Sequence, residues 1–204
     1  MKRIVLLIVA VLLIVTCFAG CTQEVPLTES YKAKYVEFLK AYKTESKVCT
    51  YALRDFDNNE IPELIIINST GYALKTVVSI YSYNGEVYKM GDYSNPSGSS
   101  ANGFRFSTNP KYPGLFELYW GYDVDHFGYI SIKDGKVSYE PLWNNYKALD
   151  PVFYEKLSDN AELIKEAESI YADIKSENAA PINQLVTYNL SEQNFEVVIN
   201  AYTK

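Results

Sequence analysis

The sequence predicts an α+β domain whose strands form a mostly antiparallel sheet, with a helix before them and helices after them. Two hairpin signals, Asn84-Gly85 and Asp134-Gly135, lie between β-rich runs in the middle of the chain. Helical periodicity is confined to the stretches before and after these runs, which is typical of an α+β fold. The length of 204 residues fits one domain.

The expected N-terminal helix covers residues 28–44. Its apolar side chains recur at the spacing of one helical face, while lysine and glutamate residues occupy the other positions. The apolar positions are Tyr31, Tyr35, Phe38, Leu39 and Tyr42. This pattern predicts a helix that packs one face on a core.

The first expected strands lie on either side of an acidic loop. Val48–Leu53 precedes the loop, and Leu64–Ile67 follows it as an unbroken β-branched run, which is expected of a strand covered on both faces. Thr76–Tyr83 and Glu86–Met90 then form the two arms of the Asn84-Gly85 hairpin. These runs predict the first part of the sheet.

The second part of the sheet is expected after residues 94–103, whose Ser, Asn, Gly and Pro residues indicate a loop. Alternating apolar side chains predict a strand from Phe116 to Tyr122. At Asp134-Gly135 a two-residue turn fixes which residues face each other, and the resulting register separates apolar from polar faces. The implied opposite pairs are Ile132 with Val137, Ser131 with Ser138, and Ile130 with Tyr139.

The last quarter of the chain is expected to be mainly helical. Asp150 and Pro151 fit the N-cap and the first position of a helix. A further helix is expected behind a cap at Asp159 or Asn160, because apolar residues recur at helical spacing from Leu163 to Ile174. These features predict a helical subregion over residues 145–204.

The end of the chain is expected to contribute one more strand and one more helix. Leu185–Leu190 fits a short strand, and Ser191 fits the cap of a final helix. The side chains that this helix would bury are Phe195, Val198, Ile199 and Tyr202. We expect this subregion to belong to a single domain spanning residues 28–204.

The chain begins with the pattern of a signal peptide. Lys2 and Arg3 precede an apolar run from Ile4 to Ala19, and two small residues come directly before Cys21. The run is shorter than the roughly 20 apolar residues that a spanning helix requires. A cleaved lipoprotein signal, an ordinary secretory signal and an uncleaved anchor are the three interpretations, and we favour the first.

The segment Phe18-Ala19-Gly20-Cys21 resembles the lipobox of bacterial lipoproteins, although the family usually has leucine where this chain has Phe18. The resemblance implies that residues 1–20 are removed and that Cys21 carries a diacylglyceryl group, and two acyl chains are sufficient for stable anchoring. Residues 21–27 would then be a short tether. We therefore expect the domain on the outer face of the cell membrane, with the membrane itself as a partner.

Net charge and cysteine content limit the partners and the disulfides that the protein can have. Removing residues 1–20 takes away two of the 19 basic residues and none of the 25 acidic ones, which leaves a net charge of −8 and argues against nucleic acid as a partner. Of the three cysteines, Cys17 leaves with the signal and Cys21 carries the lipid. Cys49 is then alone, so we expect a buried thiol without a disulfide. We expect a monomer.

The densest set of oxygen ligands lies in the nine residues Asp55–Glu63. Oxygen donors at alternate positions of a tight loop suit a hard cation such as Ca²⁺. An EF-hand loop starting at Asp55 would need glycine at its sixth position and a bidentate glutamate at its twelfth, where this chain has Glu60 and Ile66. The loop is therefore not an EF-hand.

The spacing does resemble the calcium loop of integrin-type FG-GAP repeats, in which a loop of alternating aspartates leads into an apolar strand. The ligands that the resemblance implies are the side chains of Asp55, Asp57, Asn59 and Glu63 and the backbone oxygen of Ile61. Both family glycines are replaced, by Asn58 and by Glu60, and only asparagine tolerates a left-handed backbone well. We expect a structural Ca²⁺; the alternative is an acidic turn in which Asp55 pairs with Arg54 or caps the turn.

Asp123, Asp125 and His126 form a second cluster, which an envelope hydrolase could use with His126 as general base. The alternative, which we favour, is a polar turn between two strands.

Tyrosines give a third candidate surface. If Tyr112, Tyr119, Tyr122 and Tyr129 share an exposed face, they would stack on a glycan or bind a partner protein, whereas tyrosines are otherwise common in half-buried sheet positions. The sequence thus favours a non-enzymatic envelope protein that binds a protein or glycan ligand.

Overall fold

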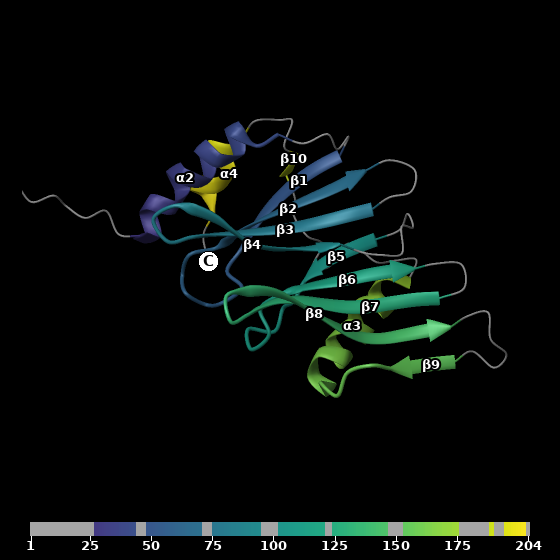
Figure 1. Cartoon of the computed structure of the whole chain (residues 1–204). Helices are drawn as coiled ribbons and strands as arrows, with labels where there is room; N and C mark the ends of the chain where they lie inside the picture. The colour runs from purple at the N-terminus through teal and green to yellow at the C-terminus, as the bar shows by residue number, and fades with distance from the viewer. Residues whose placement is uncertain are drawn as a thin grey trace, which may run out of the picture.

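The computed structural model describes residues 27–43, 48–70, 75–94, 102–120, 124–146, 153–175, 188–189 and 194–202. The elements follow one another along the chain as shown in Figure 1. They are α2 (Leu27–Ala41), β1 (Val48–Arg54), β2 (Glu63–Thr70), β3 (Lys75–Tyr83), β4 (Val87–Ser94), β5 (Asn102–Phe106), β6 (Leu115–Trp120), β7 (Val124–Lys133), β8 (Lys136–Tyr146), β9 (Phe153–Lys156), α3 (Ala161–Lys175), β10 (Tyr188–Asn189) and α4 (Phe195–Ala201).

The described strands form two antiparallel sheets. The first has the order β10-β1-β2-β3-β4 and the second has the order β5-β6-β7-β8-β9. The α+β class and the antiparallel pairing predicted from the sequence are confirmed, whereas the division of the strands into two sheets was not predicted. Within each sheet the strands follow chain order, except that β10 comes from late in the chain and pairs with β1.

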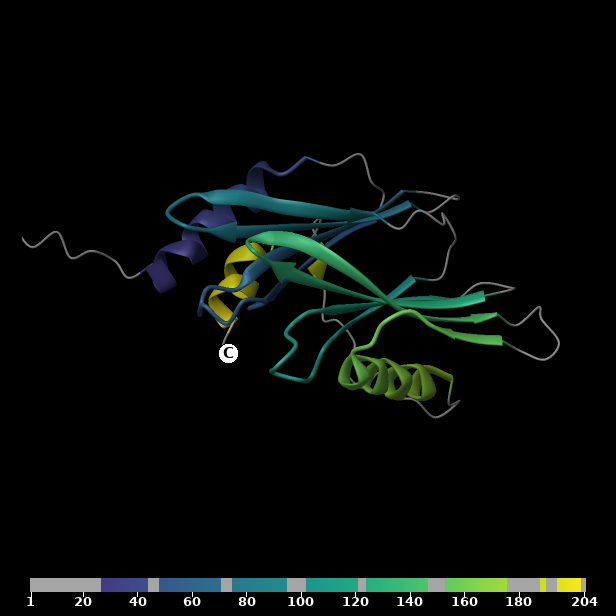
Figure 2. The same cartoon turned by 60° about the horizontal axis from the view of Figure 1, so that its bottom comes forward.

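The two sheets stack face to face, and helices cover their outer faces. Figure 2 shows α3 on the outer side of the second sheet. Alternate residues of the strands point into the layer between the sheets, where side chains of both sheets meet in one cluster. The buried members are Ala52, Phe56, Ile65, Ile67, Val78 and Ile80 from the first sheet and its loop, and Phe104, Leu115 and Ile130 from the second.

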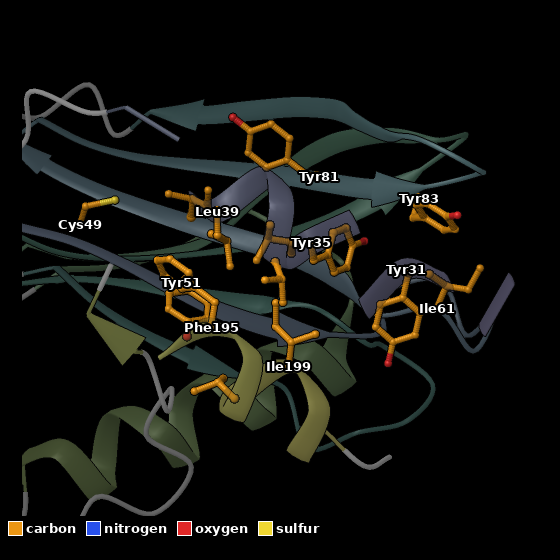
Figure 3. Packing of buried hydrophobic residues seen from close by; sticks show 14 residues of the cluster. Tyr31, Tyr35, Leu39, Cys49, Tyr51, Ile61, Tyr81, Tyr83, Phe195 and Ile199 are labelled. Atoms are coloured by element: carbon orange, nitrogen blue, oxygen red, sulfur yellow. The ribbon is translucent and has the colours of Figure 1, made fainter. Parts of the chain in front are cut away.

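The intervening residues of the first sheet point to its outer face, where α2 and α4 lie side by side (Figure 1). Figure 3 shows this cluster, in which the rings of Tyr51 and Phe195 lie 5.6 Å apart between centroids. Cys49 belongs to the same cluster and is 5% exposed. Burial raises the pKa of its thiol to about 11, and the prediction of a buried thiol is confirmed.

The hairpin register at Asp134-Gly135 is confirmed residue by residue, because Ile132 faces Val137, Ser131 faces Ser138 and Ile130 faces Tyr139. A bulge follows between Phe127 and Gly128. Its extra residue, Leu142, points its buried side chain to the α3 side of the sheet.

Three expectations from the sequence are wrong. The helix expected from Asp150-Pro151 is replaced by the strand β9, which pairs with β8 from Trp143 to Tyr146. The loop expected over residues 94–103 gives way at its end to β5, which pairs with β6. The final helix has Asn194 rather than Ser191 at its N-cap position.

The predicted cap of α3 is confirmed, because the side-chain oxygen of Asn160 accepts a hydrogen bond from the Leu163 amide at 3.2 Å. The predicted signal peptide and Cys21 lie outside the described residues. None of the described helices is long and apolar enough to cross a membrane.

Candidate metal centre

The loop between β1 and β2 adopts a left-handed backbone at Asn58 and Glu60, although glutamate does not favour that conformation. Asn58 has a φ of 59° and Glu60 has a φ of 76°, so both positions at which the loops that it resembles have glycine are left-handed here. For a residue with a side chain such as Glu60 this conformation costs roughly 1–2 kcal/mol. Something in the loop must therefore compensate.

The compensation comes from the two aspartates. Asp55 accepts hydrogen bonds from the amides of Asn59 and Glu60, at 3.2 and 3.1 Å. Asp57 accepts a second bond from the Asn59 amide at 3.2 Å. These charge-assisted bonds hold the chain in a tight curve around the aspartates and so fix the left-handed turn at Glu60.

Asn59 and Ile61, the next two predicted ligand positions, also make hydrogen bonds and packing contacts that hold the loop. The Asn59 side-chain nitrogen donates to Asp57 at 3.0 Å, and its oxygen accepts from the Ile61 amide at 2.7 Å. The Ile61 side chain is buried in the cluster beneath α2. Tyr35 of α2 also donates to the Pro62 carbonyl at 2.9 Å, which anchors the exit of the loop.

Glu63 is the buried member of the group, with no exposed surface. One of its carboxylate oxygens accepts from the Phe56 amide at 2.8 Å and the other accepts from the Ser82 hydroxyl at 3.1 Å. Burial, together with the nearby negative charge of Asp57, raises the pKa of the Glu63 carboxyl to about 7. A cation beside these groups would oppose both effects.

The loop brings three carboxylates together. Asp55, Asp57 and Glu63 each offer an oxygen, and the three oxygens lie within 4.8 Å of one another, which is close enough for one metal ion to reach all of them. Nη2 of Arg54 does not point toward the three carboxylates. It donates a hydrogen bond to the Ser107 carbonyl at 2.9 Å. The cluster can therefore hold a metal ion.

The polar turn expected at Asp125 and His126 is wrong, because both residues lie within β7, and the structure also separates these two side chains of the alternative hydrolase cluster. Asp125 and His126 are neighbours on β7, so their side chains leave opposite faces of the sheet. Asp125 is buried and accepts from the Tyr171 hydroxyl of α3 at 2.5 Å. His126 faces the other way and contacts Asn144, 2.6 Å from Nδ1 to Oδ1. Asp123 lies outside the described residues.

The structure describes only two of the four side chains of the predicted tyrosine surface, those of Tyr112 and Tyr129. Tyr129 is 4% exposed and lies with Tyr112 in the cluster beneath α3, so these two rings contribute to the core. Tyr122 and the side chain of Tyr119 lie outside what the structure describes.

One polar group was missed by sequence reasoning. Glu117 on β6 is fully buried in the layer between the sheets and accepts a short hydrogen bond from the Tyr93 hydroxyl of β4. The Tyr139 hydroxyl bonds to Glu117 and also to Nε2 of His126. The available signal was an acidic residue within an otherwise apolar strand, but its partners come from three other strands and could not be identified from the sequence.

Comparisons with models of protein families, with curated proteins and with solved structures find no match to this chain.

Proposed function

We propose that the protein is a lipid-anchored module on the outer face of the cell membrane that binds a protein or glycan ligand, and that its β1–β2 loop holds a structural Ca²⁺. The observation that carries the cation site is the convergence of Asp55, Asp57 and Glu63 on one point. Carboxylate oxygens are the ligands that Ca²⁺ prefers, and the carbonyl of Ile61 and water would complete its coordination.

The position of the loop supports a structural role for the ion. The loop joins β1 to β2, and Glu63 is the first residue of β2. An ion bound there ties the end of one strand to the start of the next. The opposite orientation of Asp125 and His126 favours a binding module over a hydrolase that would use both side chains.

Calcium titration tests the ion site. The mature chain, residues 21–204, should release or absorb heat on binding Ca²⁺ with a dissociation constant of roughly 10⁻⁴ to 10⁻³ M, and its melting temperature should fall when a chelator is added. Asp57→Asn should remove most of this affinity, whereas Asp159→Asn, an exposed carboxylate outside the loop, should keep it. Absence of heat together with an unchanged melting temperature would exclude the site.

Cell fractionation tests the anchor. In a bacterial host the full chain should appear in the membrane fraction, and Cys21→Ser should abolish lipid attachment and leave an unprocessed precursor. Cys49→Ser is the matched control, since this buried thiol carries no lipid, and it should remain anchored. Normal processing and release of the Cys21→Ser protein would show an ordinary secretory signal and contradict the lipoprotein assignment.

A further inference from the structure

The residues on either side of Asp55 reach across to the second sheet. The Phe56 ring is 2% exposed and meets the Phe106 ring of β5 nearly edge-on, with 6.3 Å between centroids and 82° between planes. The Arg54 guanidinium lies over the same ring, 5.3 Å from its centroid, and donates to the Ser107 carbonyl at 2.9 Å. The backbone that carries Asp55 is thus held on both sides by the last residue of β5 and the residue that follows it.

The same contacts control the spacing of the carboxylates. Phe56 lies between Asp55 and Asp57 in the chain, and its amide donates to Glu63 at 2.8 Å. Its position therefore fixes both aspartates relative to Glu63. Because the three ligand oxygens lie within 4.8 Å of one another, a small displacement of Phe56 would open the site.

Phe106 is itself firmly held. The Ser107 amide donates to the Gly114 carbonyl at 3.0 Å, and the Ser107 hydroxyl donates to Glu166 of α3 at 3.0 Å. Glu166 also accepts from the Thr108 amide at 2.6 Å. The chain that follows Phe106 is therefore fastened to α3, so the ring provides a fixed support for Phe56.

We propose that Phe106, together with Arg54 which lies on it, positions the cation ligands from the opposite sheet. This inference rests on the proposed function, because it requires the loop to bind Ca²⁺. By linkage, a contact that improves Ca²⁺ binding is itself strengthened when Ca²⁺ binds, so the ion also stabilises the junction between the sheets.

The test compares two phenylalanines of β5 that point into the same inner cluster, Phe104 and Phe106. In the mature chain, Phe106→Leu should raise the dissociation constant for Ca²⁺ by about five-fold or more. Phe104→Leu, which removes a buried ring other than the one that meets Phe56 edge-on, should leave that constant within about two-fold of the wild type. Both variants should lower the melting temperature of the metal-free protein.

A second variant covers the case in which Phe106→Leu does not fold. Arg54→Lys keeps the positive charge beside the site but loses the planar group that stacks on Phe106, and it should weaken Ca²⁺ binding in the same direction. Wild-type affinity in the folded variants, or equal weakening by Phe104→Leu, overturns the positioning role and leaves the calcium site intact. Absence of binding by the wild type overturns the proposed site and, with it, this inference.

Discussion

The substitution Gly128→Ala is expected to lower the free energy of unfolding by at least about 3 kcal/mol. A Cβ atom at this position of β7 would lie 2.1 Å from the Tyr139 hydroxyl oxygen and 2.3 Å from two ring carbons. Tyr139 cannot easily move away, because its ring stacks on Tyr93 with 4.5 Å between centroids and its hydroxyl bonds to Glu117 and His126. Urea unfolding followed by tryptophan fluorescence measures the loss.

Two further variants show whether this clash is the cause. In Gly128→Ala/Tyr139→Leu the ring is gone, so the double variant should be less destabilised than the sum of the two single variants. Gly91→Ala should cost much less, because its Cβ would meet atoms of Val137 at 3.1 Å and no closer. Strict additivity in the double variant would contradict the explanation.

Glu63→Gln is expected to have opposite effects with and without Ca²⁺. The glutamine oxygen can still accept from the Phe56 amide, and its nitrogen can donate to the Ser82 hydroxyl in place of the bond that Ser82 now donates. The substitution nevertheless removes a fully buried negative charge. Because burying a charge without a nearby cation is unfavourable, the metal-free variant should be more stable than the wild type by about 1–2 kcal/mol at pH 8. Its Ca²⁺ affinity should fall at least about ten-fold, because a charged ligand is lost.

The control is Glu60→Gln, which removes the same charge from an exposed position in the same loop. Its Ca²⁺ affinity should change by no more than roughly two-fold, because screening weakens interactions between exposed charges. Titration calorimetry and urea unfolding, each with and without chelator, provide the two measurements. Equal loss of affinity in both variants would show that Glu63 acts through net charge and not as a ligand.

The candidate metal centre could be predicted from the sequence because its ligands are local. Asp55, Asp57 and Glu63 lie on one short loop, so their spacing along the chain already limits their spacing in space. The left-handed backbone at Glu60 could not be predicted, since it depends on two carboxylates, those of Asp55 and Asp57, that accept hydrogen bonds from the loop amides. The Glu117 cluster could not be predicted either, because its members come from four strands.

The fold could be predicted wherever a local signal determined it, as at the Asp134-Gly135 turn. At β9, pairing with β8 prevails over a capping signal at Asp150-Pro151 that would have favoured a helix. The division of the strands into two sheets could not be predicted either, because burial on both faces removes the sequence pattern that would show it. Each sheet has a helix on one face and the other sheet on its second face, so consecutive residues such as Leu115 and Phe116 are both fully buried and show no alternation.

The order of the strands also constrains how the chain can assemble. The second sheet and α3 come from one continuous stretch, residues 102–175, whereas the first sheet needs β10 and α4 from later in the chain. Tyr51 bonds to Asn194 and Lys40 pairs with Glu196, across separations of 143 and 156 residues. Until residues 188–201 are synthesised, β1 keeps an open hydrogen-bonding edge and α2 lacks its companion helix, so the half of the domain that is translated first is the last to be completed.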